Sequence, residues 1–384
     1  MLGLNGYAMR IGLLLAAAGP CVAAQATDSI FANGFEAPRW VQGYYVGYER
    51  TLYPIGDVDF STVTHLMVGR VRPLADGSVT TDFDIDTVNG PAWAHAAVNA
   101  AHAAGRKAIG MVGGAGEVGG FEGAASAAHR ATFVANLLAV VDTYHFDGLD
   151  LDWEPLEGND KALFVALAQA LRAARPGLLL TVPLLWTNTN FDDTPDPFLA
   201  QIAPLFDRIN VMTYDMAGPW DGWQSWHNSA LYGETPNTPS SISATIAYHR
   251  ASGVPAAKLG YGIAFYGDCW QGVTAPHQPG GNISNSDGTM SYTNILAGYY
   301  TPSRRIWDAT AKVPYLSSST PFGVGGCTFL SYDDAESIAG KGAYARAQGL
   351  GSVIIWTISQ GHIPTLPAGQ RDPLLDAIRT SFLQ

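Results

Sequence analysis

The sequence predicts an α/β fold, a closed (β/α)8 TIM barrel with a small α+β insertion after the seventh strand. Two observations support this prediction. Eight short runs rich in β-branched and aromatic residues alternate with helical patterns along the chain. Several of these helical patterns end at a glycine, where a helix C-terminus is expected. Eight βα units are typical of a closed barrel, and a doubly wound open sheet is the alternative.

The expected strands and helices alternate from residue 41 to residue 358. The strands are Val41 to Val46, His65 to Val71, Lys107 to Val112, Phe146 to Trp153, Leu178 to Leu185, Arg208 to Tyr214, Leu259 to Phe265 and Ser352 to Ile358. The helical patterns include Ala92 to Ala104, Ala124 to Tyr144, Asn159 to Ala174, Ser240 to Ser252 and Asp334 to Gln348, three of them followed by Gly105, Gly253 and Gly349.

The first 26 residues have the composition of an export signal. Arg10 precedes an apolar run from Ile11 to Ala18, and small residues follow as far as Ala26. The apolar run is too short to span a membrane. Cys21 follows a proline, which disfavours a lipoprotein attachment site there. We therefore expect a signal peptide over residues 1–26, a linker over 27–38, and a secreted protein, extracellular or periplasmic.

Composition limits the partners of the mature chain. The net charge is −12, and the 21 Lys and Arg residues are scattered rather than clustered. Proteins that bind nucleic acid usually present a basic patch, so we expect neither a nucleic-acid nor a membrane partner. Residues 39–384 are sufficient for one large domain, and we expect a monomer.

Several standard chemistries lack sequence support. G-x-S-x-G, H-E-x-x-H and phosphate-loop motifs are absent, and the nine His are dispersed, so we expect no metal and no cofactor. The run from Gly114 to Gly119 matches G-x-G-x-x-G, which alone is a weak dinucleotide signal. The helical pattern after it starts only near Ala124, and the acidic residue about twenty positions on, Asp142, falls inside a helix.

One expected strand contains an acidic row. In an extended segment Asp150, Asp152 and Glu154 share one face, while Leu149, Leu151 and Trp153 share the other. A solvent-exposed edge strand is the alternative, but helical patterns on both sides indicate a βαβ setting, in which strands are covered. Buried neighbouring carboxylates raise one another's pKa and retain a proton.

The position of each carboxylate along this strand suggests its role. Glu154 would lie at the carboxyl end of the strand, where parallel barrels place their chemistry, and is the natural general acid. Asp147 lies on the opposite face, so we expect it to brace the turn entering the strand.

The spacing Asp147-x-x-Asp150-x-Asp152-x-Glu154 resembles the D-x-x-D-x-D-x-E signature of family 18 glycoside hydrolases, and of the bacterial chitinases in particular. Other segments resemble the same family over roughly residues 40–365. They are Gly43-Tyr44-Tyr45 of the first strand, Met212-Thr213-Tyr214-Asp215 of the sixth, Trp356 of the eighth, Gly218-Pro219-Trp220 with His227-Asn228, Asp308 to Tyr315, and Ser331 to Asp334.

Two departures from the family pattern are visible. The third strand reads Met111-Val112-Gly113-Gly114 where the family usually has S-x-G-G, so a hydroxyl expected behind Asp150 is missing. We therefore expect Asp150 to have less support, and its pairing with Asp152 to be less secure. The residues after Trp356 lack the acidic groups often found there, which we expect to affect the edge of the site more than its chemistry.

The resemblance implies a retaining mechanism in which the 2-acetamido oxygen of the substrate is the nucleophile and an oxazolinium ion is the intermediate. It implies that Glu154 is the acid and base, and that Asp152 holds the acetamido N–H and shares a proton with Asp150. Tyr214 would bind the acetamido oxygen and Asp215 would orient the sugar. The expected substrate-binding residues are Tyr44, Met212, Trp220 and Trp356. From position alone, Tyr214 is equally well explained as a packing residue, and Trp356 is better explained as one.

Three functions are compatible with this resemblance. The first is a chitinase acting on β-1,4-linked N-acetylglucosamine polymers, with chitin or chito-oligosaccharides as partners. The second is a non-catalytic chitin-binding lectin of the same fold, which Glu154 disfavours because such relatives typically lose the acid. The third is an endo-β-N-acetylglucosaminidase acting on N-glycan cores, which the large insertion disfavours.

Residues 271–330 form a connection too long for an ordinary βα loop. The segment contains enough apolar residues for a small core, and Cys269 and Cys327 lie near its two ends. Because an exported protein meets oxidising conditions, we expect a Cys269–Cys327 disulfide, with two unpaired buried thiols as the alternative. We expect a compact α+β insertion that forms one wall of a substrate groove, and, from Trp220, Trp223 and Trp226, an exposed platform for stacking on sugars.

Overall fold

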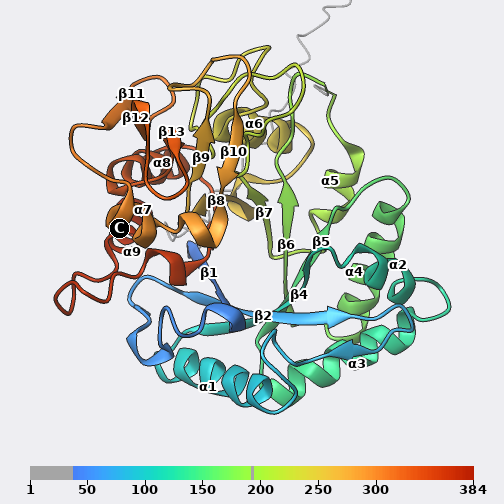
Figure 1. The fold of residues 1–384 in the computed structure, drawn as a ribbon. Coiled ribbons are helices and arrows are strands. Elements are labelled where there is room, and N and C mark those ends of the chain that lie inside the picture. Colours follow the sequence, from blue (N-terminus) through green and yellow to red (C-terminus); the bar gives the residue numbers. More distant parts are fainter. Residues whose placement is uncertain (1–37, 192–193) are drawn as a thin grey trace, which may run out of the picture. The chain divides into compact units, whose positions relative to one another are not determined.

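The computed structural model describes residues 38–191 and 194–384, in which eight parallel strands form a closed barrel (Figure 1). The strands are β1 (Trp40–Val46), β2 (His65–Pro73), β4 (Lys107–Ala115), β5 (Gly148–Glu154), β6 (Leu179–Leu185), β7 (Arg208–Met212), β8 (Leu259–Ala264) and β14 (Ser352–Trp356). Strand β1 pairs with both β2 and β14, which closes the ring. All eight expected strands are confirmed, and the open-sheet alternative is wrong. The predicted signal peptide and residues 27–37 of the linker lie outside the described residues.

Helices surround the barrel on its outer side (Figure 1). They are α1 (Asn89–Ala103), α2 (Val118–Ala124), α3 (Arg130–Tyr144), α4 (Asp160–Ala174), α5 (Pro197–Ile202), α6 (Ile242–Ala251), α8 (Ala335–Ala347) and α9 (Pro373–Ile378). Short elements complete the connections: β3 (Val79–Thr80), η1 (Gly47–Glu49), η2 (Ile55–Asp57), η3 (Ala256–Lys258), η5 (Ile358–Gly361) and η6 (Arg379–Leu383). No helix within the described ranges has the length and apolar character needed to cross a membrane.

Glycines end three of the predicted helices, as expected. Gly105, Gly253 and Gly349 follow α1, α6 and α8 at positive φ, a conformation that costs glycine little. One helix was predicted too long, because within the pattern from Ala124 to Tyr144 the helix α3 starts only at Arg130, while Ala124 is the last residue of the separate helix α2.

The G-x-G-x-x-G segment therefore has a different setting from the predicted one. Helix α2 starts at Val118, within the motif, and not near Ala124. Asp142 does lie inside a helix, α3, and its carboxylate pairs with Arg175 at the surface. No acidic residue of the kind a dinucleotide ribose requires follows at that spacing, and the motif instead supplies tight backbone turns at the end of β4.

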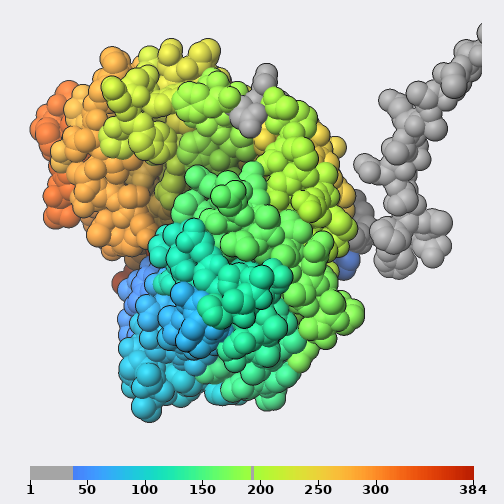
Figure 2. Space-filling view, turned by 90° about the vertical axis from the view of Figure 1, so that its right-hand side faces the viewer, coloured from blue at the N-terminus to red at the C-terminus, as the bar shows by residue number. Residues whose placement is uncertain are grey.

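The insertion after β8 is a five-stranded antiparallel sheet with one helix, in the order β10-β9-β13-β12-β11. Its elements are β9 (Asp268–Gln271), β10 (Asn282–Asn285), η4 (Asp287–Met290), α7 (Tyr292–Gly298), β11 (Arg305–Asp308), β12 (Val313–Phe322) and β13 (Cys327–Ser331). The sheet begins at Asp268, three residues before the predicted boundary. Figure 2 shows the insertion in orange at the upper left and the first βα units in blue to cyan at the lower left.

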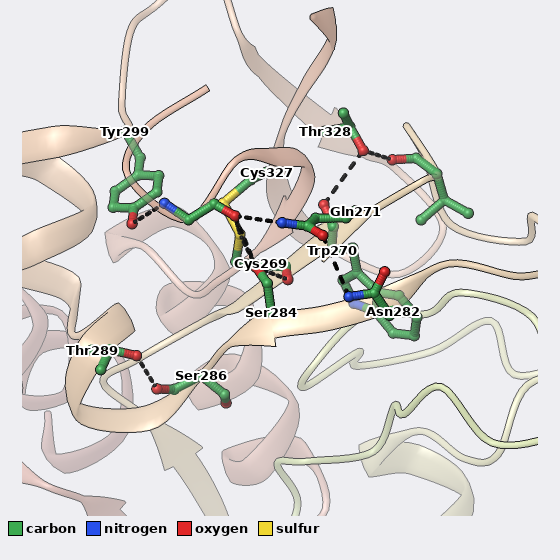
Figure 3. The surroundings of a disulfide bond; sticks show 12 residues. Cys269, Trp270, Gln271, Asn282, Ser284, Ser286, Thr289, Tyr299, Cys327 and Thr328 are labelled. Carbon is green, nitrogen blue, oxygen red and sulfur yellow. Dashed lines mark hydrogen bonds between the residues drawn. A yellow bond between two sulfur atoms is a disulfide. The ribbon is translucent and has the colours of Figure 1, made fainter. Parts of the chain in front are cut away.

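A disulfide joins Cys269 of β9 to Cys327 of β13, as predicted, so the alternative of two free thiols is wrong (Figure 3). Beside it, the carbonyl of Gly325 accepts hydrogen bonds from Gln271 Nε2 at 2.8 Å and Ser284 Oγ at 3.0 Å. The insertion also has the expected apolar core, with Tyr292, Ile295, Leu316 and Phe322 among its buried members.

Alternation along the barrel strands divides the apolar residues between two layers. On β5, Leu149, Leu151 and Trp153 face the helices, and the Trp153 ring stacks on Phe121 at 4.7 Å. The side chains of the other face point into the barrel, where a smaller apolar cluster lies: Tyr44, Met67, Ile109, Met111, Met212, Tyr214, Ala264, Tyr266 and Ile354. This arrangement directs Asp150, Asp152 and Glu154 into the barrel interior.

Candidate active site

The acidic row of β5 lies at the carboxyl end of the barrel, as its alternation predicted. Asp150 and Asp152 are buried and Glu154, at the end of the strand, is partly buried. Strand β4 approaches Asp152 closely at Gly113, where an added Cβ would lie 2.4 Å from the Asp152 carbonyl oxygen. The φ of Gly113 is +93°, so both space and backbone conformation require a glycine here.

Asp150 is better supported than the sequence suggested. Its Oδ2 accepts a hydrogen bond from Tyr44 Oη at 2.7 Å and its Oδ1 one from Thr181 Oγ1 at 2.5 Å. Thr181 lies on β6 directly opposite Asp150, while Met111 takes the β4 position where a serine was expected. The prediction that Asp150 lacks hydroxyl support is therefore wrong, and Tyr44, predicted to bind substrate, holds this carboxylate.

Burial raises the pKa of Asp150 to about 6, and the hydrogen bonds from Thr181 and Tyr44 act in the opposite direction. Without them, the same buried carboxylate would retain its proton to still higher pH.

Asp152 and Glu154 form a hydrogen-bonded carboxyl pair. Burial, followed by the negative charges of Glu154 and Asp150, raises the pKa of Asp152 well above its usual range. Burial also raises the pKa of Glu154, with a further contribution from Asp215, while the hydrogen bond to Asp152 opposes the shift. The pair therefore holds a proton to higher pH than two isolated carboxyl groups would. Asp152 was expected to pair with Asp150, but in the structure its hydrogen-bond partner is Glu154.

Asp152 also has a buried oxygen that accepts no hydrogen bond from a protein donor within the described ranges. Its Oδ1 is buried and has no hydrogen-bond partner among the described residues. A buried acceptor without a partner is costly in a resting protein, and a ligand N–H placed there would remove that cost.

Tyr214 and Asp215 follow β7, which ends two residues earlier than predicted, at Met212. Thr213 then bridges to β8, where its Oγ1 donates to the Gly262 carbonyl at 2.8 Å and accepts the Gly262 N–H at 2.9 Å. Tyr214 is buried in the inner apolar cluster, and its pKa is raised by burial and by the charges of Glu154 and Asp152. The sequence therefore placed this tyrosine correctly beside the acidic row.

Asp215 lies in the left-handed region, with φ at +53°, and its N–H donates to Asn228 Oδ1 at 2.6 Å. Tyr266 Oη donates to Asp215 Oδ1 at 2.8 Å. Burial raises the pKa of Asp215 to about 6, against the effect of this bond. Tyr266 was not singled out from the sequence; its position just after the seventh strand was the signal that could have found it.

Aromatic side chains border the carboxylates. The Trp356 ring, at the end of β14, lies 5.3 Å from that of Tyr44, and Met212 belongs to the same inner cluster. Trp220 is 45% exposed and its ring lies 6.1 Å from that of Trp186, a residue the sequence did not indicate.

The predicted platform of three indoles is only partly correct. Trp226 is fully buried and donates its Nε1–H to the Ser240 carbonyl at 2.9 Å. Trp223 instead contacts Phe191, which is 79% exposed, at a ring distance of 5.5 Å. A cavity of about 350 Å³ beside Glu154 is lined by Trp186 and Phe191, among others.

The residues after Trp356 form a buried polar network rather than an acidic edge. Thr357 Oγ1 and Gln360 Nε2 both donate to the carboxylate of Glu49, the latter at 2.9 Å. Gln360 Nε2 also donates to Asp287 Oδ1 at 2.8 Å. An acidic group from η1 therefore lies beside Thr357 and Gln360, although the residues that follow Trp356 in the sequence are not acidic themselves.

The fold and site define a TIM barrel with a buried acidic row at the carboxyl ends of its strands. The chain belongs to glycosyl hydrolases family 18, whose family model matches residues 41–361. The matched relatives come from bacteria, a nematode, plants and mammals, so the match assigns the family and not a bacterial origin.

Individual relatives agree with this family. Chitinase A1 of Niallia circulans is 33% identical over 279 residues, which cover 63% of this chain and 39% of that protein. The first four curated relatives are matched over 39% to 62% of their own length. Among solved structures, the Group IV chitinase of Ostrinia furnacalis in complex with allosamidin has a TM-score of 0.75 and 26% identity, covering 89% of this chain and 98% of that one.

The same fold also occurs in an agglutinin. The chitinase-like agglutinin RobpsCRA of Robinia pseudoacacia has a TM-score of 0.72 and 23% identity, covering 89% of this chain and 99% of that one. At this identity the likeness concerns the fold alone, so the fold does not separate a hydrolase from a lectin.

Proposed function

We propose that this protein is a secreted chitinase that hydrolyses β-1,4-linked N-acetylglucosamine polymers with retention of configuration, by substrate-assisted catalysis. The observation that supports this most directly is the carboxyl pair of Glu154 and Asp152. A general acid must be protonated near its working pH, and burial raises the pKa of Glu154 in that direction.

In the first step Glu154 donates its proton to the glycosidic oxygen and the bond from that oxygen to the anomeric carbon breaks. The substrate's 2-acetamido oxygen forms the new bond to the anomeric carbon, giving a cyclic oxazolinium ion. Asp152 Oδ1, the buried acceptor without a partner, receives the acetamido N–H and offsets the positive charge. Holding the internal nucleophile in this way replaces a bimolecular encounter.

In the second step Glu154 accepts a proton from water as the water oxygen attacks the anomeric carbon and opens the ring. Tyr214 would hydrogen-bond the acetamido oxygen in both steps, and Asp215, held by Tyr266, would orient the sugar. Trp356 and Met212 supply apolar surface against the bound sugar, and Trp220 an exposed ring beyond it. Asp150 would act indirectly, through the effect of its charge on Asp152, since its own oxygens accept hydrogen bonds from Tyr44 and Thr181.

The lectin alternative is supported by the agglutinin that shares the fold. Against it, the full acidic row of β5 is present, and a sugar-binding protein gains nothing from the cost of two buried carboxylates and a partly buried one. The endoglycosidase alternative is disfavoured by the insertion, for which we propose a role as one wall of the substrate groove. The disulfide between Cys269 and Cys327 fits the oxidising compartment that a secreted protein meets.

One experiment separates the three functions. The mature protein and its Glu154→Gln variant are incubated with chitin and with an N-glycoprotein, and released sugars are identified by mass. We expect chito-oligosaccharides from chitin with the wild type alone. Release of glycans from the glycoprotein only would assign an endoglycosidase, and chitin binding without any product would assign a lectin.

The stereochemical course tests the mechanism itself. Two inversions, by the acetamido oxygen and then by water, give an initial excess of the β-anomer in the NMR spectrum of the fresh product. An initial excess of the α-anomer would contradict substrate assistance.

A further inference from the structure

Arg70 places a positive charge beside the acidic row. It lies near the end of β2, and its side chain is 24% exposed. Two carboxylates hold the guanidinium: Asp84 Oδ2 lies 3.0 Å from Nε and Glu117 Oε1 lies 3.3 Å from Nη1. The Gly113 carbonyl lies 3.5 Å from Nη1. The guanidinium is thus fixed over the end of β4.

The end of β4 is also the nearest backbone to Asp152. Gly113 is the register partner of Asp152, and an added Cβ at Gly114 would lie 3.5 Å from Arg70 Nη1. Because Gly113 and Gly114 have no side chains, the guanidinium of Arg70 and the carboxyl pair can lie on the two sides of the end of β4. The terminal methyl of Met111, also on β4, lies 3.1 Å from the same Cβ position at Gly114, and this uncharged side chain compensates neither charge.

Asp152 and Arg70 are each surrounded mainly by acidic and phenolic groups. Asp152 is faced by Asp150, Glu154 and Arg70, and interacts with the phenols of Tyr44 and Tyr214. Arg70 is faced by Asp84 and Glu117, and by the phenol of Tyr48. Arg70 is thus a cation that acts on Asp152 among negative neighbours.

Arg70 reaches β4 opposite Asp152 rather than opposite Glu154: its Nη1 lies against the carbonyl of Gly113, the register partner of Asp152, whereas the register partner of Glu154 is Ala115. The charge of Arg70 opposes the burial and the like charges that raise the pKa of Asp152, whereas the shift in the pKa of Glu154 arises from burial, Asp152 and Asp215. In the proposed mechanism the shared proton must lie on Glu154, and Asp152 must be ionised. A cation that acts on Asp152 favours that distribution of the proton.

We propose that Arg70 is a positioning residue for this reaction, whose guanidinium, held by Asp84 and Glu117, biases the proton shared by Asp152 and Glu154 toward Glu154. This inference rests on the proposed hydrolytic function. If so, Arg70, which lies three strands earlier in the chain and touches neither reacting atom, determines which of the two carboxyl groups donates the proton.

The test is the pH profile of kcat on a soluble chito-oligosaccharide for Arg70→Met. Without the cation, ionisation of Asp152 requires higher pH, so we expect the acid limb to move up by about one unit, which is about a tenfold loss of kcat on that limb, with little change in KM. Arg70→Lys retains the charge and should recover most of the loss. Arg72→Met is the matched control, because Arg72 lies on the same strand and pairs with Asp82 at 3.5 Å; its profile should not move.

A variant of opposite sign guards against a merely structural effect. Glu117→Gln removes a negative charge beside the guanidinium, so the acid limb should move to lower pH, and this variant also serves if Arg70→Met does not fold. An unshifted limb in Arg70→Met, or a shift of Glu117→Gln in the same direction as Arg70→Met, would overturn the proposal. If the wild type hydrolyses no substrate, the proposed function fails, and carboxyl ¹³C NMR titration of Asp152 in the wild type and Arg70→Met still decides the role of Arg70.

Discussion

The carboxyl groups near the two ends of β5 have pKa values that are shifted in opposite directions. At the amino end, Asp147 accepts hydrogen bonds from Lys107 Nζ at 2.7 Å and from the Ala108 N–H at 2.9 Å, and it pairs with His102 Nε2 at 2.9 Å. These contacts outweigh the effect of burial and lower the pKa of Asp147. At the carboxyl end, burial and like charges raise the pKa values of Asp152 and Glu154.

This difference separates a structural acid from a chemical one within a single strand. Asp147 has partners for its negative charge and ties β5 to β4, as predicted for a residue that braces the turn. Asp152 and Glu154 are hydrogen-bonded to each other rather than to a cation, so the pair holds a proton that can be transferred. The partners of a buried carboxylate, more than its burial, therefore indicate which role it serves.

The largest expected effect is that of Glu154→Gln at the chemical end. General acid catalysis typically contributes about 10²–10⁴-fold, so we expect a loss of that order in kcat on chitin. Circular dichroism should show an unchanged fold, and chito-oligosaccharides should still bind. More than a tenth of the wild-type rate would contradict the assignment of Glu154.

Asp152→Asn should give the next largest effect. The amide cannot offset the positive charge of the oxazolinium ion, so we expect a large fall in kcat with a modest change in KM, as for an interaction made mainly in the transition state. Steady-state kinetics on a defined oligosaccharide measures both. A raised KM at unchanged kcat would mean that Asp152 only binds substrate.

Thr181→Val tests Asp150, the innermost member of the row, with a nearly isosteric change. It removes the hydroxyl that donates to Asp150 Oδ1, so the pKa of Asp150 should rise above about 6 and more of the row should stay protonated. We expect a several-fold loss of kcat that is greatest at acid pH. Equal loss at every pH would indicate a packing defect instead.

The smallest effect on activity is expected from Asp147→Asn at the structural end. Loss of its charged hydrogen bonds should reduce the free energy of unfolding by about 1–2 kcal/mol at neutral pH, measured by urea denaturation, with kcat unchanged. Since the folded pKa of Asp147 is lowered, its stabilisation is present above the unfolded value of about 3.9 and is lost as pH falls through the folded value. The variant and wild type should therefore converge in stability at low pH, and a constant difference would contradict the charge argument.

The same linkage has the opposite sign for Asp150. Its folded pKa is raised to about 6, above an unfolded value of about 3.9, so its contribution to stability falls as pH rises between these values. Asp147 and Asp150 thus oppose each other in the pH dependence of stability, although they are close neighbours in the chain.

Local patterns in the sequence determined the strands and the direction of the acidic row. Strand alternation has a period of two, so Asp150, Asp152 and Glu154 had to share a face whatever packed around them. The helix ends at Gly105, Gly253 and Gly349 were likewise predictable from the sequence, because the positive φ at each position is a property of glycine itself. The disulfide was also accessible, since only Cys269 and Cys327 follow the predicted signal.

The tertiary structure alone decided which groups support that row. Thr181 replaces the missing serine because β5 and β6 pair in a register that places it opposite Asp150, and Tyr44 reaches the same carboxylate from β1, on another side of the closed ring. Neither contact has a local signature, because residues far apart in the chain meet only when the barrel closes. The choice of Glu154 over Asp150 as partner of Asp152, and the burial of Trp226 beneath the insertion, have the same origin: they depend on where neighbouring elements pack, which no period or spacing in the sequence encodes.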